Sequence, residues 1–210
     1  MGIGVLILGE SGSGKTYSIK TMNPATTGIL SVEKGRLPFK NNFNVIKNAT
    51  YPVITDVLKR HTMKSYIIDD SQYLMVNELF DTAKIPGYNK FTDLALHFRN
   101  LIHIVNHNMP DDCIVYFLHH IESDGNGRLK AKTIGKMLDE KLTIEGCFDI
   151  VLCTQIESGN HLFITQSDGV LPAKSPEDMF ANKIPNDLGA VDAAIRDYYG
   201  LTEKEENETD

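Results

Sequence analysis

The chain has no tryptophan, only three cysteines, and fewer basic than acidic residues. Cys113, Cys147 and Cys153 are an odd number without a CxxC pair, so we expect small buried side chains in a reducing compartment and no disulfide framework. Lysine and arginine total 21 against 28 acidic residues, which gives a net charge of −7. Proteins that coat nucleic acid through their global field are basic, so any DNA contact must come from a local patch.

Long apolar runs are also missing. No segment approaches the ~18 apolar residues that a membrane-spanning helix needs, so we predict no membrane span and a cytoplasmic protein. The first apolar stretch has no basic region before it and leads into a glycine-rich loop, so we interpret it as a strand and not as a signal peptide. The 210 residues suit one domain over 1–200 and an acidic, disordered tail over 201–210.

Strand-like and helix-like segments alternate along the chain. Several strand candidates, such as GVLIL and CIVYFL, are continuous apolar runs, which is typical of strands buried on both faces of a parallel sheet. Helical faces are predicted over 94–105 and 188–198. A polar, glycine-containing turn over 157–160 predicts an antiparallel hairpin. We therefore expect a doubly wound, mainly parallel α/β sheet with this hairpin at one edge.

The segment GESGSGKT matches the pattern GxxxxGK[ST] in full. It follows an apolar strand candidate and precedes a short helix candidate that Pro24 ends, which is the context that a phosphate-binding loop requires. We expect its backbone N–H groups and the start of the helix to bind the phosphates of a nucleotide. The predicted contact residues are Gly9, Glu10, Ser11, Gly12, Ser13, Gly14, Lys15, Thr16 and Tyr17.

Two residues of this loop have predicted chemical roles, and ATP and Mg²⁺ are the expected cofactors. Lys15 extends to the β- and γ-phosphates as a point charge, and the Thr16 hydroxyl ligates Mg²⁺. The metal also needs a carboxylate at the end of another buried strand. The segment YIIDD supplies Asp69 for this role, with Asp70 beside it.

Hydrolysis needs a group that orients and deprotonates water, and the sequence offers two. Asp70 belongs to the acid pair, and Glu33 ends an earlier strand candidate, where it would face the crevice at the carboxyl ends of the strands. The strand candidate IVYFLHH ends in His119 and His120. One of these histidines could sense the γ-phosphate and transmit its presence to the next loop.

The order of these motifs resembles the RecA-like ATPase core: GESGSGKT, ILSVEKG, YIIDDSQYL, IVYFLHH and then a glycine-rich basic loop. With GRLKAKTIGKML and KSPEDMFANKIPNDL, residues 3–200 are similar to small phage-encoded single-domain RecA-like ATPases associated with recombination and single-strand annealing. The resemblance implies that Glu33 activates water and that His119 or His120 senses phosphate. It also implies mobile DNA-binding loops over 82–90 and 121–133. Because the added domains of recombinases are missing, annealing or an accessory role is favoured over autonomous strand exchange.

The second of these loops contains a cluster of cations beside two glycines. Its basic residues are Arg128, Lys130, Lys132 and Lys136. They predict a weak, salt-sensitive contact with single-stranded DNA, to which Tyr88 of the other loop would add base stacking. A contact with the γ-phosphate of a neighbouring subunit and a solvated loop are the alternatives.

The sequence thus predicts an Mg²⁺-dependent ATPase that forms homo-oligomers and acts with single-stranded DNA in phage recombination or replication, in the host cytoplasm. One alternative is a nucleotide-gated assembly or loader module that binds a replication protein. An acidic surface is suited to binding a protein partner. The other is a small-molecule kinase, although the chain shows no clustered arginine lid.

Overall fold

A computed structural model describes residues 1–33 and 35–201, with the side chains of all of these except residues 136, 139 and 140. The predicted tail therefore lies outside the described residues apart from Leu201, and so does the side chain of Lys136. The core is a nine-stranded mixed sheet of order β3-β2-β4-β5-β1-β7-β8-β9, in which β6 pairs with β5.

Strands and helices are interspersed along the chain, but they do not alternate strictly as the sequence pattern predicts, because strands follow strands and helices follow helices at several places. The strands are β1 (Ile3–Gly9), β2 (Thr27–Ser31), β3 (Asn44–Lys47), β4 (Ser65–Asp69), β5 (Ile114–Ser123), β6 (Leu129–Ala131), β7 (Ile150–Glu157), β8 (Asn160–Ile164) and β9 (Lys183–Pro185). The helices are the 3₁₀ helix η1 (Thr16–Thr21), α1 (Tyr51–Arg60), α2 (Tyr73–Asp81), α3 (Asn89–Asn108), α4 (Lys136–Lys141), the 3₁₀ helix η2 (Ile144–Cys147) and α5 (Leu188–Tyr198).

The pairing of the strands confirms the predicted mainly parallel sheet. All pairs from β3 to β7 along the sheet are parallel. The predicted hairpin is present, because β7 and β8 pair antiparallel with Glu157 opposite Asn160. It is not the edge, however, since β9 pairs antiparallel with β8. The sequence pattern missed β9 because it has three residues and one of them is Pro185, which cannot donate to a ladder.

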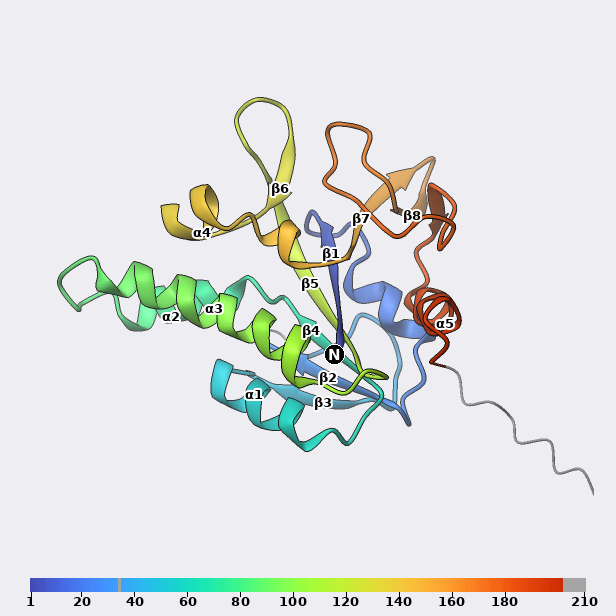
Figure 1. Ribbon diagram of the computed structural model, residues 1–210, viewed down its shortest axis with the longest axis horizontal. Helices are drawn as coiled ribbons and strands as arrows, with labels where there is room; N and C mark the ends of the chain where they lie inside the picture. The colour runs from blue at the N-terminus through green and yellow to red at the C-terminus, as the bar shows by residue number, and fades with distance from the viewer. Residues whose placement is uncertain (34, 202–210) are drawn as a thin grey trace, which may run out of the picture.

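Alternate residues of the central strands face opposite sides of the sheet. In β1, Leu6 and Leu8 pack on one side and Val5 and Ile7 on the other, and all four are fully buried. Helices α1 to α4 cover the first side, whereas η1 and α5 cover the second (Figure 1). Helices on both faces confirm that the sheet is doubly wound.

Connections leave the neighbouring strands β1 and β5 in opposite directions. The chain passes from β1 toward β2 through η1 on one face, and from β5 toward β7 through α4 and η2 on the other. Because the two connections diverge, a crevice opens between the carboxyl ends of β1 and β5, which is where open α/β sheets bind ligands. The phosphate-loop motif begins at Gly9, the last residue of β1.

Two local predictions differ from the structure. The helix after the loop is a six-residue 3₁₀ helix, which offers a smaller dipole than a long α-helix. Its residues TYSIKT are mostly poor helix formers, and Pro24 follows. The predicted mobile loop over 121–133 is largely a β-hairpin, because β5 continues to Ser123 and pairs antiparallel with β6. The predicted loop over 82–90 is a loop between α2 and α3 only as far as residue 88, because α3 begins at Asn89.

No helix in the described part of the chain combines the length and the apolar character that crossing a bilayer requires. The three cysteines are free thiols. Burial raises the pKa values of Cys113 and Cys153 to about 12, so both stay protonated at neutral pH. They fill core space on one side of the sheet, as expected for small hydrophobic side chains.

A polar network fastens α5 to the amino-terminal ends of β4 and β5. Asp192 Oδ1 accepts hydrogen bonds from Ser65 Oγ at 2.7 Å and from Tyr116 Oη at 2.9 Å. Its Oδ2 accepts from Arg196 Nε at 2.7 Å, and both side chains are less than one-fifth exposed. Arg196 also donates to the carbonyl of Asp112 at 2.9 Å. The network therefore fixes the helix that covers the second face.

We predict that Asp192→Ala lowers the free energy of unfolding by about 3 kcal/mol, because it leaves the half-buried Arg196 guanidinium without its carboxylate. Urea denaturation measures this change. The control is Asp197→Ala, an exposed position on the same helix, which should change stability by less than about 0.5 kcal/mol. Equal effects of the two substitutions would show that the network does not hold α5.

Candidate functional site

The segment GESGSGKT forms a tight loop between β1 and η1. Only glycine fits at position 9, because a Cβ there would lie 1.8 Å from Thr154 Oγ1 on β7. Gly12 and Gly14 have φ angles of 79° and 103°, in the left-handed region that favours glycine. The Ser13 hydroxyl lies 2.6 Å from Thr154 Oγ1 and fastens the loop to the sheet.

The Lys15 side chain turns back into this loop. Its Nζ donates hydrogen bonds of 2.8 Å each to the carbonyls of Gly9 and Glu10, and the residue is only 6% exposed. The loop thus holds an ammonium group within a curl of backbone. A curl of this kind with a fixed cation is suited to an anion such as a phosphate.

Thr16 and Asp69 meet at the same place. Thr16 Oγ1 donates a hydrogen bond of 2.9 Å to Asp69 Oδ1, although 53 residues separate them in sequence. Asp69 is the last residue of β4 and is 5% exposed. A hydroxyl and a carboxylate are hard oxygen donors, which suit Mg²⁺ because this ion binds to few protein groups and keeps several waters. The predicted magnesium pair therefore fits the metal.

Asp70 follows in an uncommon conformation, with a φ of 61°. Its Oδ1 lies 3.5 Å from Nε2 of His120 on β5. The backbone N–H of His120 donates to Gln72 Oε1 at 2.6 Å, which ties the end of β5 to the start of α2. A carboxylate and an imidazole therefore face each other across the carboxyl ends of β4 and β5.

These groups share a cavity of about 410 Å³ at the predicted crevice. The cavity is lined by Ser11, Gly12, Gly14, Lys15, Thr16, Tyr17, Arg36, Pro38, Asp69, Asp70, His120 and His161. Its volume lies within the range of roughly 300–1,000 Å³ that is usual for small-ligand sites. Of the predicted phosphate contacts, Gly9, Glu10 and Ser13 line a neighbouring cavity instead, which shares Ser11 and Gly12 with the first. The structure brings together most of the predicted site.

Glu33 lies elsewhere. The strand β2 ends at Ser31, so Glu33 follows it in an exposed position, where its Oε1 accepts a hydrogen bond of 2.9 Å from Asn77 Nδ2. Asn77 belongs to α2, and neither residue lines the 410 Å³ cavity. Of the two predicted bases, Asp70 is the one that lines this cavity. Which of them activates water stays a prediction.

The two histidines of β5 face opposite sides. His120 lines the cavity, whereas His119 is fully buried under α3, with its ring 5.6 Å from that of Phe98. His119 Nε2 lies 2.8 Å from the carbonyl of Lys132, and Nδ1 lies 2.9 Å from Ser71 Oγ. Burial lowers the pKa of His119 to about 4, so the neutral ring donates through Nε2 to the carbonyl. His119 thus connects the end of β4 with the end of β6.

Three residues that line the cavity were not identified from the sequence: Arg36, Pro38 and His161. His161 comes from β8, and its Nδ1 lies 2.9 Å from the carbonyl of Ser13 in the loop, 148 residues away. Because a carbonyl only accepts, this contact holds the proton on Nδ1. No sequence signal pairs these positions, since the contact depends on how the hairpin packs beside β1.

Three of the four predicted basic residues lie on or beside β6 of the β5–β6 hairpin, which rises beyond the carboxyl ends of the sheet (Figure 1), whereas Lys136 is the first residue of α4. Lys130 is the middle residue of β6, and Arg128 and Lys132 flank the two ends of this strand. Arg128 and Lys132 are exposed, while Lys130 Nζ lies 3.8 Å from Glu122 Oε1 and is partly neutralised. The hairpin therefore presents a modest positive face.

No protein-family model matches this chain, and no curated protein matches it with significant similarity. The resemblance to RecA-like ATPases therefore stays a prediction. The functional assignment depends on the loop motif, on the contacts between its side chains and on the cavity that they line.

The buried, neutral His119 predicts that the protein loses stability in acid. Its pKa of about 4 in the folded state is below the ordinary value of 6.5, so between these values the unfolded state binds a proton that the folded state excludes. The free energy of unfolding should therefore fall as the pH decreases from 6.5 toward 4, by up to about 3 kcal/mol. Denaturant titrations across this pH range measure the change.

The variant His119→Gln should have a flatter pH dependence than the wild type, whatever its overall stability. His103→Gln, at an exposed position on α3, should keep the wild-type dependence. If His119→Gln and the wild type lose the same stability between these pH values, the acid sensitivity does not come from His119.

Proposed function

We propose that the chain is an Mg²⁺-dependent ATPase of the RecA-like class that acts with single-stranded DNA during phage recombination or replication, in the cytoplasm of the host cell. The observation that carries the proposal is the hydrogen bond of 2.9 Å between Thr16 and Asp69, beside the Lys15 ammonium and in one cavity with it. A complete phosphate-loop motif and a strand-end carboxylate meet there, at the point of the sheet where a ligand crevice is expected.

The predicted site residues that line the cavity have separate roles in this proposal. The loop amides and Lys15 bind the phosphates and neutralise part of their charge. Thr16 and Asp69 hold the metal, which when bound neutralises the charge that develops on the β- and γ-phosphate oxygens. His120 lines the cavity, and in this proposal it senses the γ-phosphate and, as part of β5, connects the cavity with the basic hairpin.

Asp70 is the better-placed base for the attacking water. It lines the cavity and faces His120 at 3.5 Å. The family resemblance favours Glu33 instead. However, the Glu33 carboxylate accepts a hydrogen bond from Asn77, and neither residue lines the cavity. We therefore assign the orientation and deprotonation of water to Asp70.

We predict that Asp70→Asn keeps ATP affinity but lowers the turnover number at least ~100-fold, because general-base catalysis is worth about 10²–10⁴ in rate. Glu33→Gln should change turnover by less than about tenfold, since its carboxylate lies outside the cavity lining. Steady-state phosphate release and nucleotide binding are measured for both variants. Turnover that stops in Glu33→Gln and persists in Asp70→Asn would transfer the role to Glu33.

The DNA part of the proposal is supported by the cations of the hairpin. Arg128 and Lys132 are exposed at the two ends of β6, which pairs with the part of β5 that follows His119 and His120. A charged site with few phosphate contacts binds weakly and depends strongly on salt. An acidic chain that carries these cations on a hairpin is therefore expected to bind DNA at low salt and to release it at high salt.

We predict that the double variant Arg128→Glu/Lys132→Glu binds a fluorescent oligothymidine several-fold more weakly than the wild type. The slope of log affinity against log salt concentration should decrease by about 1.4, because each phosphate contact on a single strand contributes about 0.7. Lys47→Glu on the edge strand β3 is the control and should keep the wild-type slope. Wild-type protein that does not bind at low salt, or slopes that do not differ, would contradict DNA binding by the hairpin.

A further inference from the structure

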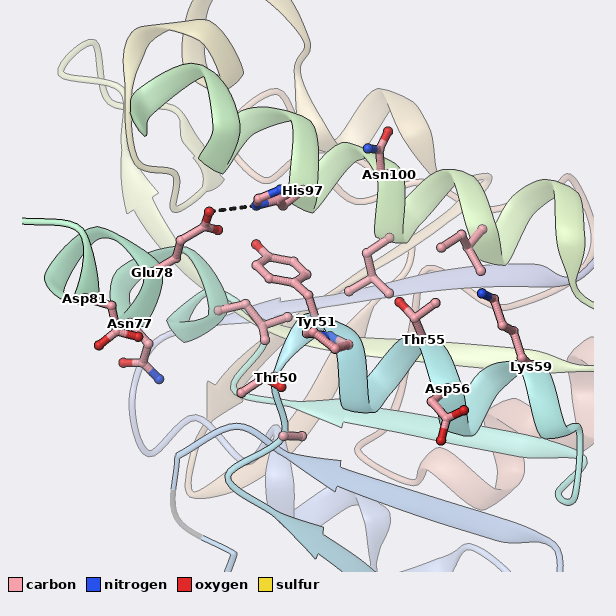
Figure 2. A pocket seen from close by; sticks show the side chains of 15 residues that line it. Thr50, Tyr51, Thr55, Asp56, Lys59, Asn77, Glu78, Asp81, His97 and Asn100 are labelled. Carbon is pink, nitrogen blue, oxygen red and sulfur yellow. Dashed lines mark hydrogen bonds and ion pairs between the residues drawn. The ribbon is translucent and has the colours of Figure 1, made fainter. Parts of the chain in front are cut away.

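A second cavity, of about 690 Å³, opens between α1, α2 and α3 (Figure 2). We call it the helix groove. Its apolar lining comes from Ala49, Pro52, Leu74, Leu101 and Ile104. It shares no lining residue with the 410 Å³ cavity, and the proposed ATPase mechanism does not use it. An apolar groove of this size on the surface of a protein marks a binding surface.

Polar side chains lie together at one end of the helix groove, and some of their atoms lack a hydrogen-bond partner. Among the described residues, Tyr51 Oη and Glu78 Oε2 are buried atoms that have no hydrogen-bond partner. The other Glu78 oxygen lies 2.6 Å from His97 Nδ1, and Figure 2 shows the three side chains together. Burial, and then the charge of Glu78, raises the pKa of Tyr51, so its hydroxyl stays neutral. Buried polar atoms without partners are costly, and an occupant with a hydrogen-bond donor would satisfy them.

The helix groove is also acidic. Three carboxylates line it, from Asp56, Glu78 and Asp81, together with the ammonium of Lys59, and the Asp56 carboxylate is ion-paired with the exposed Arg60 guanidinium. The imidazole of His97, which also lines the groove, is already hydrogen-bonded to Glu78. The occupant that fits the groove therefore combines an apolar surface with a positive charge.

The loop of residues 82–88 between α2 and α3 has this chemistry, and we call it the tip. Ile85 is 55% exposed and Tyr88 is 87% exposed, and Lys84 is exposed beside them. The tip contains no acidic residue. Figure 1 shows it at the outer end of the α2–α3 pair, projecting beyond the rest of the fold. Large apolar side chains that project in this way are unusual on an isolated surface.

We propose that the tip of one copy of this chain docks in the helix groove of a second copy. The tip precedes α3, whereas His97, Leu101 and Ile104 of the groove lie along the middle of the same helix. Two α3 helices placed antiparallel about a two-fold axis therefore bring each tip to the groove of the other copy, and both contacts form at once. Ile85 and Tyr88 cover the apolar lining, and the Lys84 ammonium lies at the Glu78 and Asp81 carboxylates.

Sedimentation velocity of the full chain over a range of micromolar concentrations, without nucleotide or DNA, tests this dimer. The wild type should dimerise reversibly, and Tyr88→Asp should weaken the dimer at least tenfold. Tyr198→Asp is the matched control, because Tyr198 is also exposed but lies on α5, on the opposite side of the sheet, and it should leave dimerisation unchanged. Both positions are at the surface, and circular dichroism checks that each variant is folded.

Exchanging the charges of Lys84 and Asp81 tests whether these two residues form an ion pair between the two copies. Lys84→Glu and Asp81→Lys should each weaken the dimer, and the double variant should recover most of the wild-type association, because the ion pair is restored with its signs reversed. A wild type that stays monomeric, or a dimer that these substitutions do not affect, would overturn the proposal. A Tyr88→Asp protein that loses DNA affinity but keeps its oligomeric state would assign the tip to DNA instead. None of these results depends on ATP hydrolysis.

Discussion

The hydrogen bond between Thr16 and Asp69 joins the loop after β1 to the end of β4, although β5 lies between these two strands. The side chains meet because the three strands are parallel and end at the same edge of the sheet. In the register, Gly9 of β1 lies opposite His120, and Ile68 of β4 lies opposite Phe117. The site therefore depends on the alignment of three strands and not on the loop alone.

Charge balance supports the proposal that this site binds a nucleotide with a divalent metal. Asp69 and Asp70 alone would repel a triphosphate, and Lys15 and Arg36 alone would bind many anions. The structure places the two carboxylates and the two cationic side chains in one cavity. In the proposed function, a divalent cation would lie between the carboxylates and the phosphates, and the Lys15 ammonium would contact the phosphates from the loop. The buried His119 adds no charge near neutral pH, because its pKa is about 4, and it acts as a fixed link between β4 and the hairpin.

Local patterns predicted the loop, the carboxylate at the end of β4 and the β7–β8 hairpin, because each depends on neighbours in sequence. The position of Glu33 could not be predicted, since β2 ends at Ser31, earlier than its apolar pattern indicates. Successive residues of a strand point to opposite faces of the sheet, so only one of the two adjacent histidines of β5 can face the cavity. The sequence alone does not reveal which one. The contact of His161 with the loop spans 148 residues and has no local signal at all.

Isothermal titration calorimetry of ATP into the folded protein, with magnesium and with a chelator, tests most directly whether this loop binds a nucleotide. We predict binding of one ATP per chain in magnesium, weaker binding in chelator, and no measurable binding to Lys15→Ala. A well-folded wild-type protein that takes up neither ATP nor GTP in magnesium would contradict the assignment of the site.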